Sequence, residues 1–297
     1  MKLKFWGVRG SIATPGEATV RYGGNTTCLE IRSDSGQVIV LDAGTGLHPL
    51  SLSLLAELPV EAHVLISHTH WDHIQGLPFF IPQFIPGNKL NIYGSFNPVT
   101  QKNIGETLAV QLQYSYFPVR EVELKTKPNF TTINQRESFT IADATITPVM
   151  MNHPVINLGY RVECNGKSIF FTGDHEPPYN IYEQDDDSYT LYQSVIDERN
   201  QYIYDVMRGV DLLVADSSYT PDEYRSGKEG WGHGTFDSSI AMARELGVGR
   251  LFFTHHEPTR SDDALEIVYS EALDRCGCSV DERERFQLAR EGLEVEL

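Results

Sequence analysis

Three imidazoles and one carboxylate stand within a single six-residue segment, His68-Thr69-His70-Trp71-Asp72-His73. Residues two apart on an extended segment point the same way, so His68 and His70 can reach one point. Asp72 and His73 follow where the chain turns, and they can face a second point nearby. Imidazole and carboxylate ligands at this spacing are suited to zinc, manganese or iron. The segment therefore predicts a metal site.

Six acidic or imidazole residues lie at, or just beyond, the end of an apolar run that predicts a strand. They are His68, from the segment above, and Asp42, His153, Asp174, Asp216 and His255. Sites in layered α/β folds gather outside the carboxyl ends of strands. A lone His or Asp at a strand end is usually a cap or turn residue, but the coincidence of six favours one shared site.

This inventory is sufficient for two metal ions. We predict that one ion is bound by His68, His70 and His153, and that a second is bound by Asp72, His73 and His255. Asp174 can bridge the two, because the oxygens of one carboxylate can hold cations ~3.5–4 Å apart. A hydroxide between the ions would be the nucleophile, its pKa lowered towards ~7. Nitrogen and oxygen ligation favours zinc, with manganese and iron as alternatives.

The elements that must position these residues alternate between strands and helices, with antiparallel hairpins interspersed. We predict strands near 2–8, 28–32, 38–41, 64–67, 90–93, 121–125, 138–141, 145–151, 158–163, 167–172, 211–215, 250–254 and 293–297. Helices are predicted near 47–57, 103–113, 237–246 and 261–275, and a polar loop at 220–231. This order indicates a layered α/β architecture, a mixed-sheet sandwich with outer helices. We expect one domain over 1–297, with an acidic, mostly helical insertion at about 176–209.

Composition narrows the class of protein. The 297 residues are 40% hydrophobic, which is enough for a substantial core. Four scattered cysteines without a C-x-x-C pair do not indicate a disulfide framework or a thiolate zinc site. The N-terminus lacks the apolar core of a signal peptide, and no apolar run approaches the ~20 residues of a membrane span. We expect a cytoplasmic protein with no membrane partner.

The net charge of −17 bears on partners. Long nucleic acid is usually held by many Lys and Arg contacts to phosphate. The charge therefore argues against a processive nuclease or a tight tRNA binder. A small anionic substrate stays open, because bound metal ions can reverse the local field.

The motif His68-x-His70-x-Asp72-His73, followed in order by His153, Gly173-Asp174 and Thr254-His255, resembles the metallo-β-lactamase fold superfamily of binuclear hydrolases. The resemblance implies an αββα sandwich of two mixed β-sheets flanked by helices. Asp42 matches the early aspartate of that family, which supports the site from behind and is not usually a ligand.

Within the superfamily, the chain is similar to the ribonuclease Z and cyclic-phosphate phosphodiesterase branch. The residues that carry this likeness are Gly24-Asn25-Thr26, Asp42 to Gly46, and Gly232-His233-Gly234-Thr235. The resemblance implies that His233 contacts the scissile phosphate and that Asp216 assists it, although ribonuclease Z commonly has Glu there. We take His233, Asp216 and Asp72 as candidate catalytic residues. The alternative for His233 is a loop histidine that caps the next helix.

The function we predict is that of a binuclear metal-dependent phosphodiesterase. The chain has no Gly- and Lys-rich arm of the kind that clamps tRNA, so we expect a small phosphodiester substrate, cyclic nucleotides included, and no long nucleic acid. The alternatives are a thioesterase or lactonase of the same fold, a di-iron redox protein and a non-catalytic binding module. The oligomeric state stays open, a homodimer included.

Several residues near these motifs have alternative roles. His175 and His256 each adjoin a proposed ligand, and His256 is an alternative to His255. The aromatic run Tyr114, Tyr116 and Phe117 is expected to pack against the protein rather than to stack on a base. Asp185 to Asp187 is expected to be a solvated loop rather than a calcium site.

Overall fold

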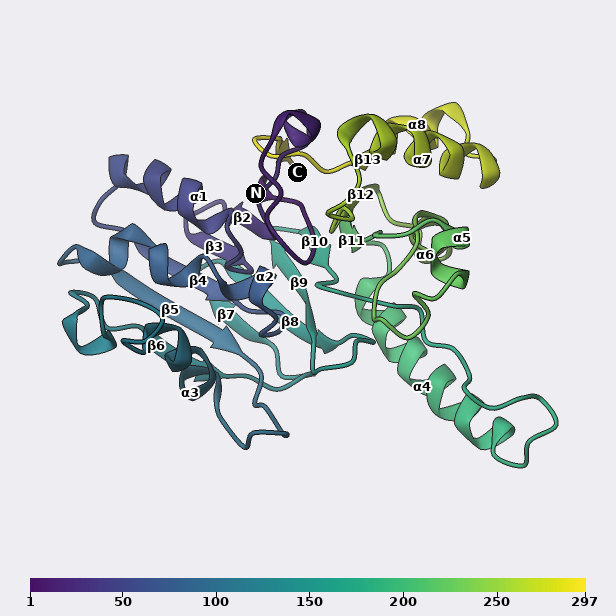
Figure 1. Ribbon diagram of the computed structural model, residues 1–297, viewed down its shortest axis with the longest axis horizontal. Helices are drawn as coiled ribbons and strands as arrows, with labels where there is room; N and C mark the ends of the chain where they lie inside the picture. Colours follow the sequence, from purple (N-terminus) through teal and green to yellow (C-terminus); the bar gives the residue numbers. More distant parts are fainter.

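Two seven-stranded mixed sheets form the centre of the protein (Figure 1), and the computed structural model describes residues 1–297. The first sheet has the order β14-β1-β2-β3-β4-β5-β6. Its strands are β1 (Lys2–Gly7), β2 (Cys28–Arg32), β3 (Val38–Leu41), β4 (Glu61–Leu65), β5 (Lys89–Gly94), β6 (Asn129–Thr132) and β14 (Glu294–Glu296). The second has the order β13-β12-β11-β10-β9-β8-β7. Its strands are β7 (Phe139–Ile141), β8 (Ala144–Met150), β9 (Leu158–Cys164), β10 (Lys167–Phe171), β11 (Leu212–Asp216), β12 (Arg250–Thr254) and β13 (Phe286–Leu288).

Helices cover the outer face of each sheet. The α-helices are α1 (Leu47–Ser53), α2 (Trp71–Ile74), α3 (Ile104–Leu108), α4 (Tyr189–Met207), α5 (Pro221–Arg225), α6 (Phe236–Leu246), α7 (Asp262–Arg275) and α8 (Val280–Arg285). Figure 1 shows α1 and α3 on the side of the first sheet, and α4, α6 and α7 on the side of the second. No helix combines the length and the apolar character that a bilayer crossing requires.

The core has three layers, which match this arrangement. The middle layer joins the facing sides of the sheets, with Phe5 and Ile31 from the first and Tyr160 and Val162 from the second. The other two layers lie between each sheet and its helices. Strand β1 shows the cause, because its alternate residues are buried and only one of its faces can meet the other sheet. The predicted αββα sandwich is confirmed.

Some local predictions were wrong. Residues 121–125 are not a strand but contain the short 3-10 helix Glu121–Glu123, because the Glu123 carboxylate accepts a hydrogen bond from the Arg120 N–H at 2.9 Å. The segment 220–231 is not all loop. It contains α5, which begins with a proline and is capped by Thr220. Strands β6 and β13 and helix α8 were not predicted.

The strand directions bring the polar strand ends to one edge. Strands β3 and β4 are parallel, and so are β10, β11 and β12. Strand β8 is antiparallel to β9, which is antiparallel to β10, so β8 and β10 run the same way. Each of these strands therefore delivers the residues that follow it to the same end of its sheet.

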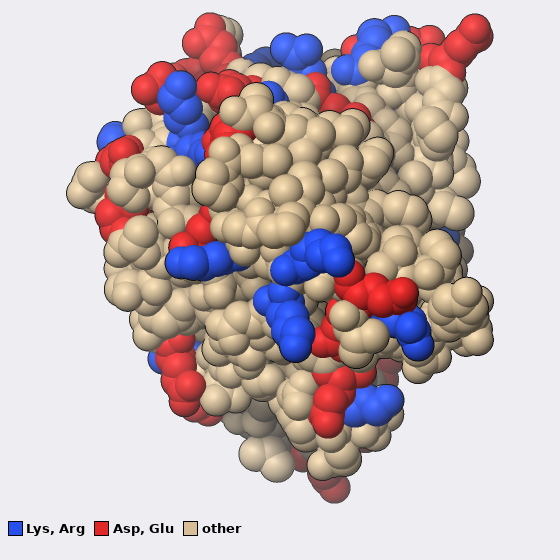
Figure 2. Space-filling view, turned by 90° about the vertical axis from the view of Figure 1, so that its left-hand side faces the viewer, with Lys and Arg blue, Asp and Glu red and all other residues tan.

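Two features of the outer surface stand apart from the two sheets and their covering helices. Helix α4, with the segment that precedes it, projects from the body of the molecule (Figure 1). It occupies the predicted insertion, and whether the chain is one domain stays a prediction. Figure 2 views the molecule from the left-hand side of Figure 1, the side of α1 and α3, and shows basic and acidic side chains intermixed around a broad area without charged side chains.

Candidate metal centre

The structure brings all seven predicted metal ligands together, in the two sets that the sequence predicts. His68, His70 and His153 form one set with Asp174, and Asp72, His73 and His255 form the other with the same Asp174. Within each set, one potential ligand atom per residue lies within 4.8 Å of the others. Their identity as ligands stays a prediction.

Asp174 lies between the two sets, with one carboxylate oxygen towards each. Its Oδ1 is 3.2 Å from His73 Nε2 and 3.3 Å from His255 Nε2. Its Oδ2 is 3.4 Å from His68 Nε2 and 3.9 Å from His153 Nε2. This is the geometry that a bridging carboxylate requires.

Left-handed backbone conformations occur directly beside the centre, just after three strands. Asp42, Gly173 and His255 each follow a strand and have positive φ angles of 61°, 58° and 58°. Asp and His are among the non-glycine residues that adopt this left-handed conformation most readily. Gly173 is required for a further reason, because a Cβ there would lie 2.4 Å from Asn157 Oδ1. Such strained positions cluster at functional sites.

The Nδ1 atoms on the side of the first sheet are held by Asp42. Its carboxylate accepts a hydrogen bond from His73 Nδ1 at 2.7 Å and another from the Ser67 hydroxyl at 2.7 Å. Because that hydroxyl donates its one hydrogen to Asp42, its lone pairs can accept from His68 Nδ1, which is 3.1 Å away. Both imidazoles therefore present Nε2, unprotonated when neutral, to the centre.

The second sheet has the same arrangement of a carboxylate, a serine hydroxyl and a histidine Nδ1. Ser218 Oγ lies 2.7 Å from Asp216 Oδ1 and 2.9 Å from His255 Nδ1, so it can donate to the carboxylate and accept from the imidazole. His153 Nδ1 donates to the carbonyl oxygen of Gly232 at 2.9 Å. His70 differs, because its Nδ1 is the atom that faces His153 Nε2, at 3.3 Å.

The donor atoms fit a pair of divalent cations. His68 Nε2, His73 Nε2 and Asp174 Oδ1 are buried without a hydrogen-bond partner, which is costly unless a ligand satisfies them. Tetrahedral zinc with bonds of ~2.0–2.1 Å places its ligands about 3.3–3.4 Å apart. Asp72 Oδ2 matches that spacing, because it lies 3.3 Å from His73 Nε2 and 3.3 Å from His255 Nε2.

Proton affinities in the centre reflect the crowding of charges. Burial lowers the pKa of His68 well below its usual value. Burial would also lower the pKa of His73, but the carboxylates of Asp174, Asp72 and Asp42 outweigh it and hold that pKa well above its usual value. At His255, burial again lowers the pKa, but the carboxylates of Asp174 and Asp216 outweigh it and raise the pKa to about 9. Metal binding needs neutral imidazoles, so cations and protons compete at these two histidines.

His233 stands beside the centre without joining either proposed ligand set. Its Nδ1 lies 2.8 Å from Asp216 Oδ2, and its ring stacks on that of His255 with centroids 4.6 Å apart. It lines a cavity of about 400 Å³ together with Ser11, His70, Trp71, Asp72 and Asp174. Asp216 thus contacts His233 directly, and it is linked to His255 through Ser218.

His175 and His256 form hydrogen bonds outside the proposed ligand sets. His256 Nε2 donates to the carbonyl oxygen of Ala289 at 2.8 Å, and burial lowers its pKa to about 3. His175 Nδ1 accepts from the Asn152 N–H at 3.2 Å, and burial lowers its pKa to about 4. The structure therefore places His255 in the centre and not His256.

The packing expected for the aromatic run holds for one residue only. Phe117 packs edge-on against Phe79, with ring centroids 5.3 Å apart. Tyr114 and Tyr116 are 74% and 71% exposed, so the expectation that they pack was wrong. The loop carries them outward, and apolar composition alone does not give the direction of a side chain.

Sequence reasoning did not identify four contributors to the site. The Ser11 N–H donates to Asp72 Oδ2 at 2.7 Å, and Ser67 and Ser218 connect carboxylates to histidines. Glu176 accepts from the N–H groups of Gly230 and Gly232, each at 2.8 Å, and so shapes the loop that holds His153. A weak signal existed for two of them, because Ser67 directly precedes a predicted ligand and Ser11 lies in a Gly-rich loop.

Known proteins with similar sequences include ribonucleases. The chain is 21% identical to ribonuclease Z of Staphylococcus epidermidis over 303 residues, which covers 91% of this chain and 93% of that protein. This likeness confirms the predicted resemblance to the ribonuclease Z branch. With the assembled ligand set, it also confirms the prediction of a metal-dependent hydrolase.

Solved structures share the fold over the whole chain. The metallo-β-lactamase fold protein YhfI from Bacillus subtilis has a TM-score of 0.67 at 20% identity, covering 99% of each chain. The short form of human tRNase Z has a TM-score of 0.60 at 16% identity, covering 100% of this chain and 99% of its own. At these identities, the likeness shows the fold alone.

The expectation that no long nucleic acid would be a partner is contradicted by these relatives. Ribonuclease Z, by its name, acts on RNA, and it matches this chain over most of its length. The expectation rested on a net charge of −17, which sums the whole surface. Contacts to a phosphate backbone depend on local groups and bound cations, so a negative total does not exclude them.

A family model agrees with the fold and the site. The model for the "Beta-lactamase superfamily domain" matches residues 37–256, well over half of the chain. The matched span contains all seven predicted ligands as well as His233 and Asp216. The chain therefore belongs to the beta-lactamase superfamily.

Proposed function

We propose that this protein is a phosphodiesterase that uses two divalent cations, with zinc favoured. The single observation that carries the proposal is His233, an imidazole anchored to Asp216 that faces the same cavity as the bridging carboxylate of Asp174. Bound divalent cations supply charge stabilisation for a phosphoryl group and make water a potent nucleophile at neutral pH.

The side chains of this protein then have separate tasks. Asp216 fixes the His233 ring through Nδ1, so that Nε2 is the atom free to meet the substrate. Water forms a new P–O bond and releases one proton to the solvent while the ester P–O bond breaks, and His233 donates a proton from Nε2 to the leaving oxygen. The products are an alcohol and a phosphate monoester. Asp72, fixed by the Ser11 N–H, belongs to the ligand set.

The substrate class that we propose first is a small phosphodiester, cyclic nucleotides included. The cavity of about 400 Å³ lies in the range of small-molecule sites. RNA is the class that the names of the relatives add, and the test therefore includes it. The alternative of a thioesterase or lactonase is less favoured, because those reactions do not need an imidazole that contacts a phosphate, which is the role proposed for His233 held by Asp216.

The test is a panel of substrates on zinc-loaded protein. It contains bis(p-nitrophenyl) phosphate, p-nitrophenyl phosphate, a cyclic nucleotide, a short RNA, an aryl thioester and a lactone. We expect the diester to exceed the monoester in kcat/KM, because a monoester adds a negative charge and lacks the second ester arm. A preference for the monoester, the thioester or the lactone would refute the proposal.

A further inference from the structure

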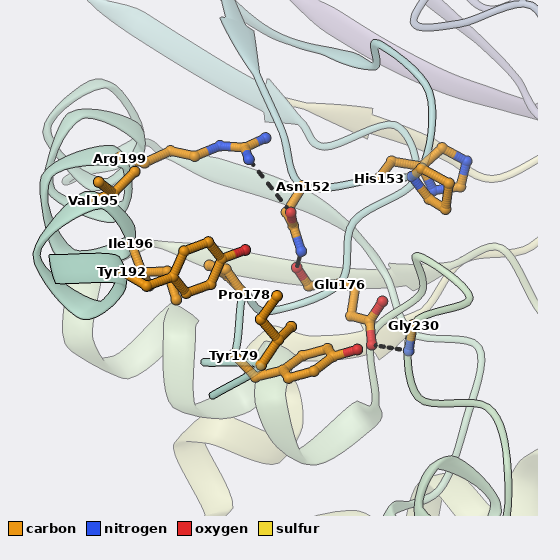
Figure 3. Close-up of a pocket in the computed structure, with 12 residues that line it drawn as sticks. Asn152, His153, Glu176, Pro178, Tyr179, Tyr192, Val195, Ile196, Arg199 and Gly230 are labelled. Carbon is orange, nitrogen blue, oxygen red and sulfur yellow. Dashed lines mark hydrogen bonds between the residues drawn. The ribbon is translucent and has the colours of Figure 1, made fainter. Parts of the chain in front are cut away.

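A second pocket is lined by His153, one of the proposed metal ligands (Figure 3). Its volume is about 320 Å³, and it is enclosed by α4, by the segment after β10 and by the loop at Gly230. Gly230 lines this pocket while His233, three residues later, lines the reaction cavity. The His153 ring, which lines this pocket, has its centroid 5.0 Å from that of His70 and 5.5 Å from that of His233, and both of these line the reaction cavity. The two spaces are therefore neighbours.

A chain of hydrogen bonds connects the pocket wall to His153, a proposed metal ligand. Arg199 on α4 donates to the carbonyl oxygen of Met151 at 2.6 Å and to Asn152 Oδ1 at 3.4 Å. Asn152 Nδ2 donates to the carbonyl oxygen of Glu176 at 2.9 Å. The Glu176 carboxylate holds the loop whose Gly232 carbonyl accepts from His153 Nδ1. A pocket built on this network has a fixed position relative to the reaction site.

The walls of the pocket are aromatic and rich in hydrogen-bond donors. Tyr179 comes from the segment after β10 and Tyr192 from α4. Figure 3 shows their hydroxyls without a hydrogen bond to the residues drawn. The guanidinium of Arg199 has only neutral acceptors, and its buried Nε has no partner. Val195 and Ile196 add apolar surface. This combination suits a flat, polarisable ring that carries acceptor atoms.

We infer that this pocket holds a nucleobase carried by one arm of the phosphodiester, an inference that rests on the proposed function. Bases stack on tyrosine rings, and their carbonyl oxygens and ring nitrogens accept hydrogen bonds from hydroxyl and guanidinium groups. An alkyl arm would leave the two tyrosine hydroxyls and Arg199 Nε without acceptors. With its phosphorus beside His233 and Asp174, a nucleotide diester extends past His153 into the pocket.

The test compares two diesters that share a leaving group and differ in the other arm. They are thymidine 5′-(p-nitrophenyl phosphate) and methyl p-nitrophenyl phosphate, and the readout is the ratio of their kcat/KM values. We expect the ratio to favour the thymidine ester in the native chain. Val195→Trp fills the pocket and should lower the ratio about 10-fold, which is the size of one lost base stack.

Leu191→Trp is the matched control, because Leu191 lies on the same helix, is 72% exposed and does not line the pocket. It should keep the native ratio. Tyr192→Ala repeats the test by removing a wall, in case the tryptophan disturbs folding. An unchanged ratio in both Val195→Trp and Tyr192→Ala would overturn the inference, while hydrolysis of the methyl ester would leave the proposed function intact.

If neither diester is hydrolysed, the proposed function fails and the pocket is judged by binding alone. The probe is thymidine 5′-monophosphate, titrated calorimetrically into the metal-loaded native chain and the two tryptophan variants. Binding that is weakened about 10-fold in Val195→Trp but not in Leu191→Trp supports the nucleobase pocket. Equal binding by all three proteins, or no binding by the native chain, overturns it.

Discussion

Asp42 and Asp216 perform the same task from opposite sides of the metal centre. Each ends or follows a strand near the middle of its sheet, and each accepts from a serine hydroxyl that is within reach of a histidine Nδ1. Each also accepts from a second imidazole directly, His73 for Asp42 and His233 for Asp216. The difference is that His73 presents Nε2 to the proposed ligands, whereas His233 presents its free nitrogen to the cavity.

The bridging position of Asp174 leads to a prediction about metal content. His153→Ala removes one ligand from one set, so the variant should retain about one ion per chain. Asp174→Ala removes a ligand from both sets, together with the negative charge between two cations, and should retain close to none. Elemental analysis of chelator-free protein, with circular dichroism as the check on folding, measures this. A higher metal content in Asp174→Ala than in His153→Ala would contradict the bridge.

His233 is predicted to act on the substrate without holding metal. His233→Ala should keep its metal and its thermal stability while kcat falls ~10²–10⁴-fold, the usual range for a positioned acid or base. If proton donation is the main role, the fall in kcat should be smaller for a p-nitrophenyl ester than for an alkyl ester, because p-nitrophenolate leaves without needing a proton. His48→Ala, at an exposed position, is the control and should retain full activity. Full activity in His233→Ala would remove the main support for phosphodiester chemistry.

At the scale of elements, the loop from Gly227 to His233 has the most direct influence on the site. Glu176 holds two of its N–H groups, and its Gly232 carbonyl orients His153. The glycine at 232 is required twice, because its φ is 87° and a Cβ there would lie 2.3 Å from His153 Nδ1. Any side chain at this position must displace either the loop or the histidine.

Two alanine substitutions in this loop separate backbone strain from damage to the site. Gly232→Ala and Gly227→Ala both place alanine at a positive φ, but only the first meets a neighbour within 4 Å. Both should lower the free energy of unfolding by about 1 kcal/mol or more. Gly232→Ala alone should also lower zinc affinity, by ~10–100-fold, because it displaces a group that orients a ligand. Equal zinc affinity in the two variants, measured by competition with a chromogenic chelator, would refute this role.

Much of the framework was predictable because it depends on local patterns. Apolar runs that end in Asp42, His68, Asp174, Asp216 or His255 mark strands and their functional ends at once. What could not be predicted depends on distant partners. Ser11 meets Asp72 across 61 positions, and Glu176 meets the loop at Gly230 across 54. Strand β6 was missed because it is polar and largely exposed, and so lacks the alternation that marks a half-buried strand.

At the scale of the whole molecule, the two sheets contribute comparable halves of the site. Each has parallel strands that carry ligands at their carboxyl ends, and the sheets pack face to face so that both sets meet at one edge. Asp174 comes from the second sheet yet contacts histidines from both. The site therefore requires the packed sandwich, and metal binding should stabilise the packing of the sheets as well as the loops.

The most direct test of the account is a metal titration of the metal-free protein with bis(p-nitrophenyl) phosphate as substrate. Zinc is added in fractions of an equivalent, and the initial rate is recorded at each step. Two ions held through one bridging carboxylate predict that the rate rises until about two equivalents are bound and then stays constant. A protein that binds no zinc, reaches full activity at one equivalent, or binds two equivalents without hydrolysing the diester would contradict the account.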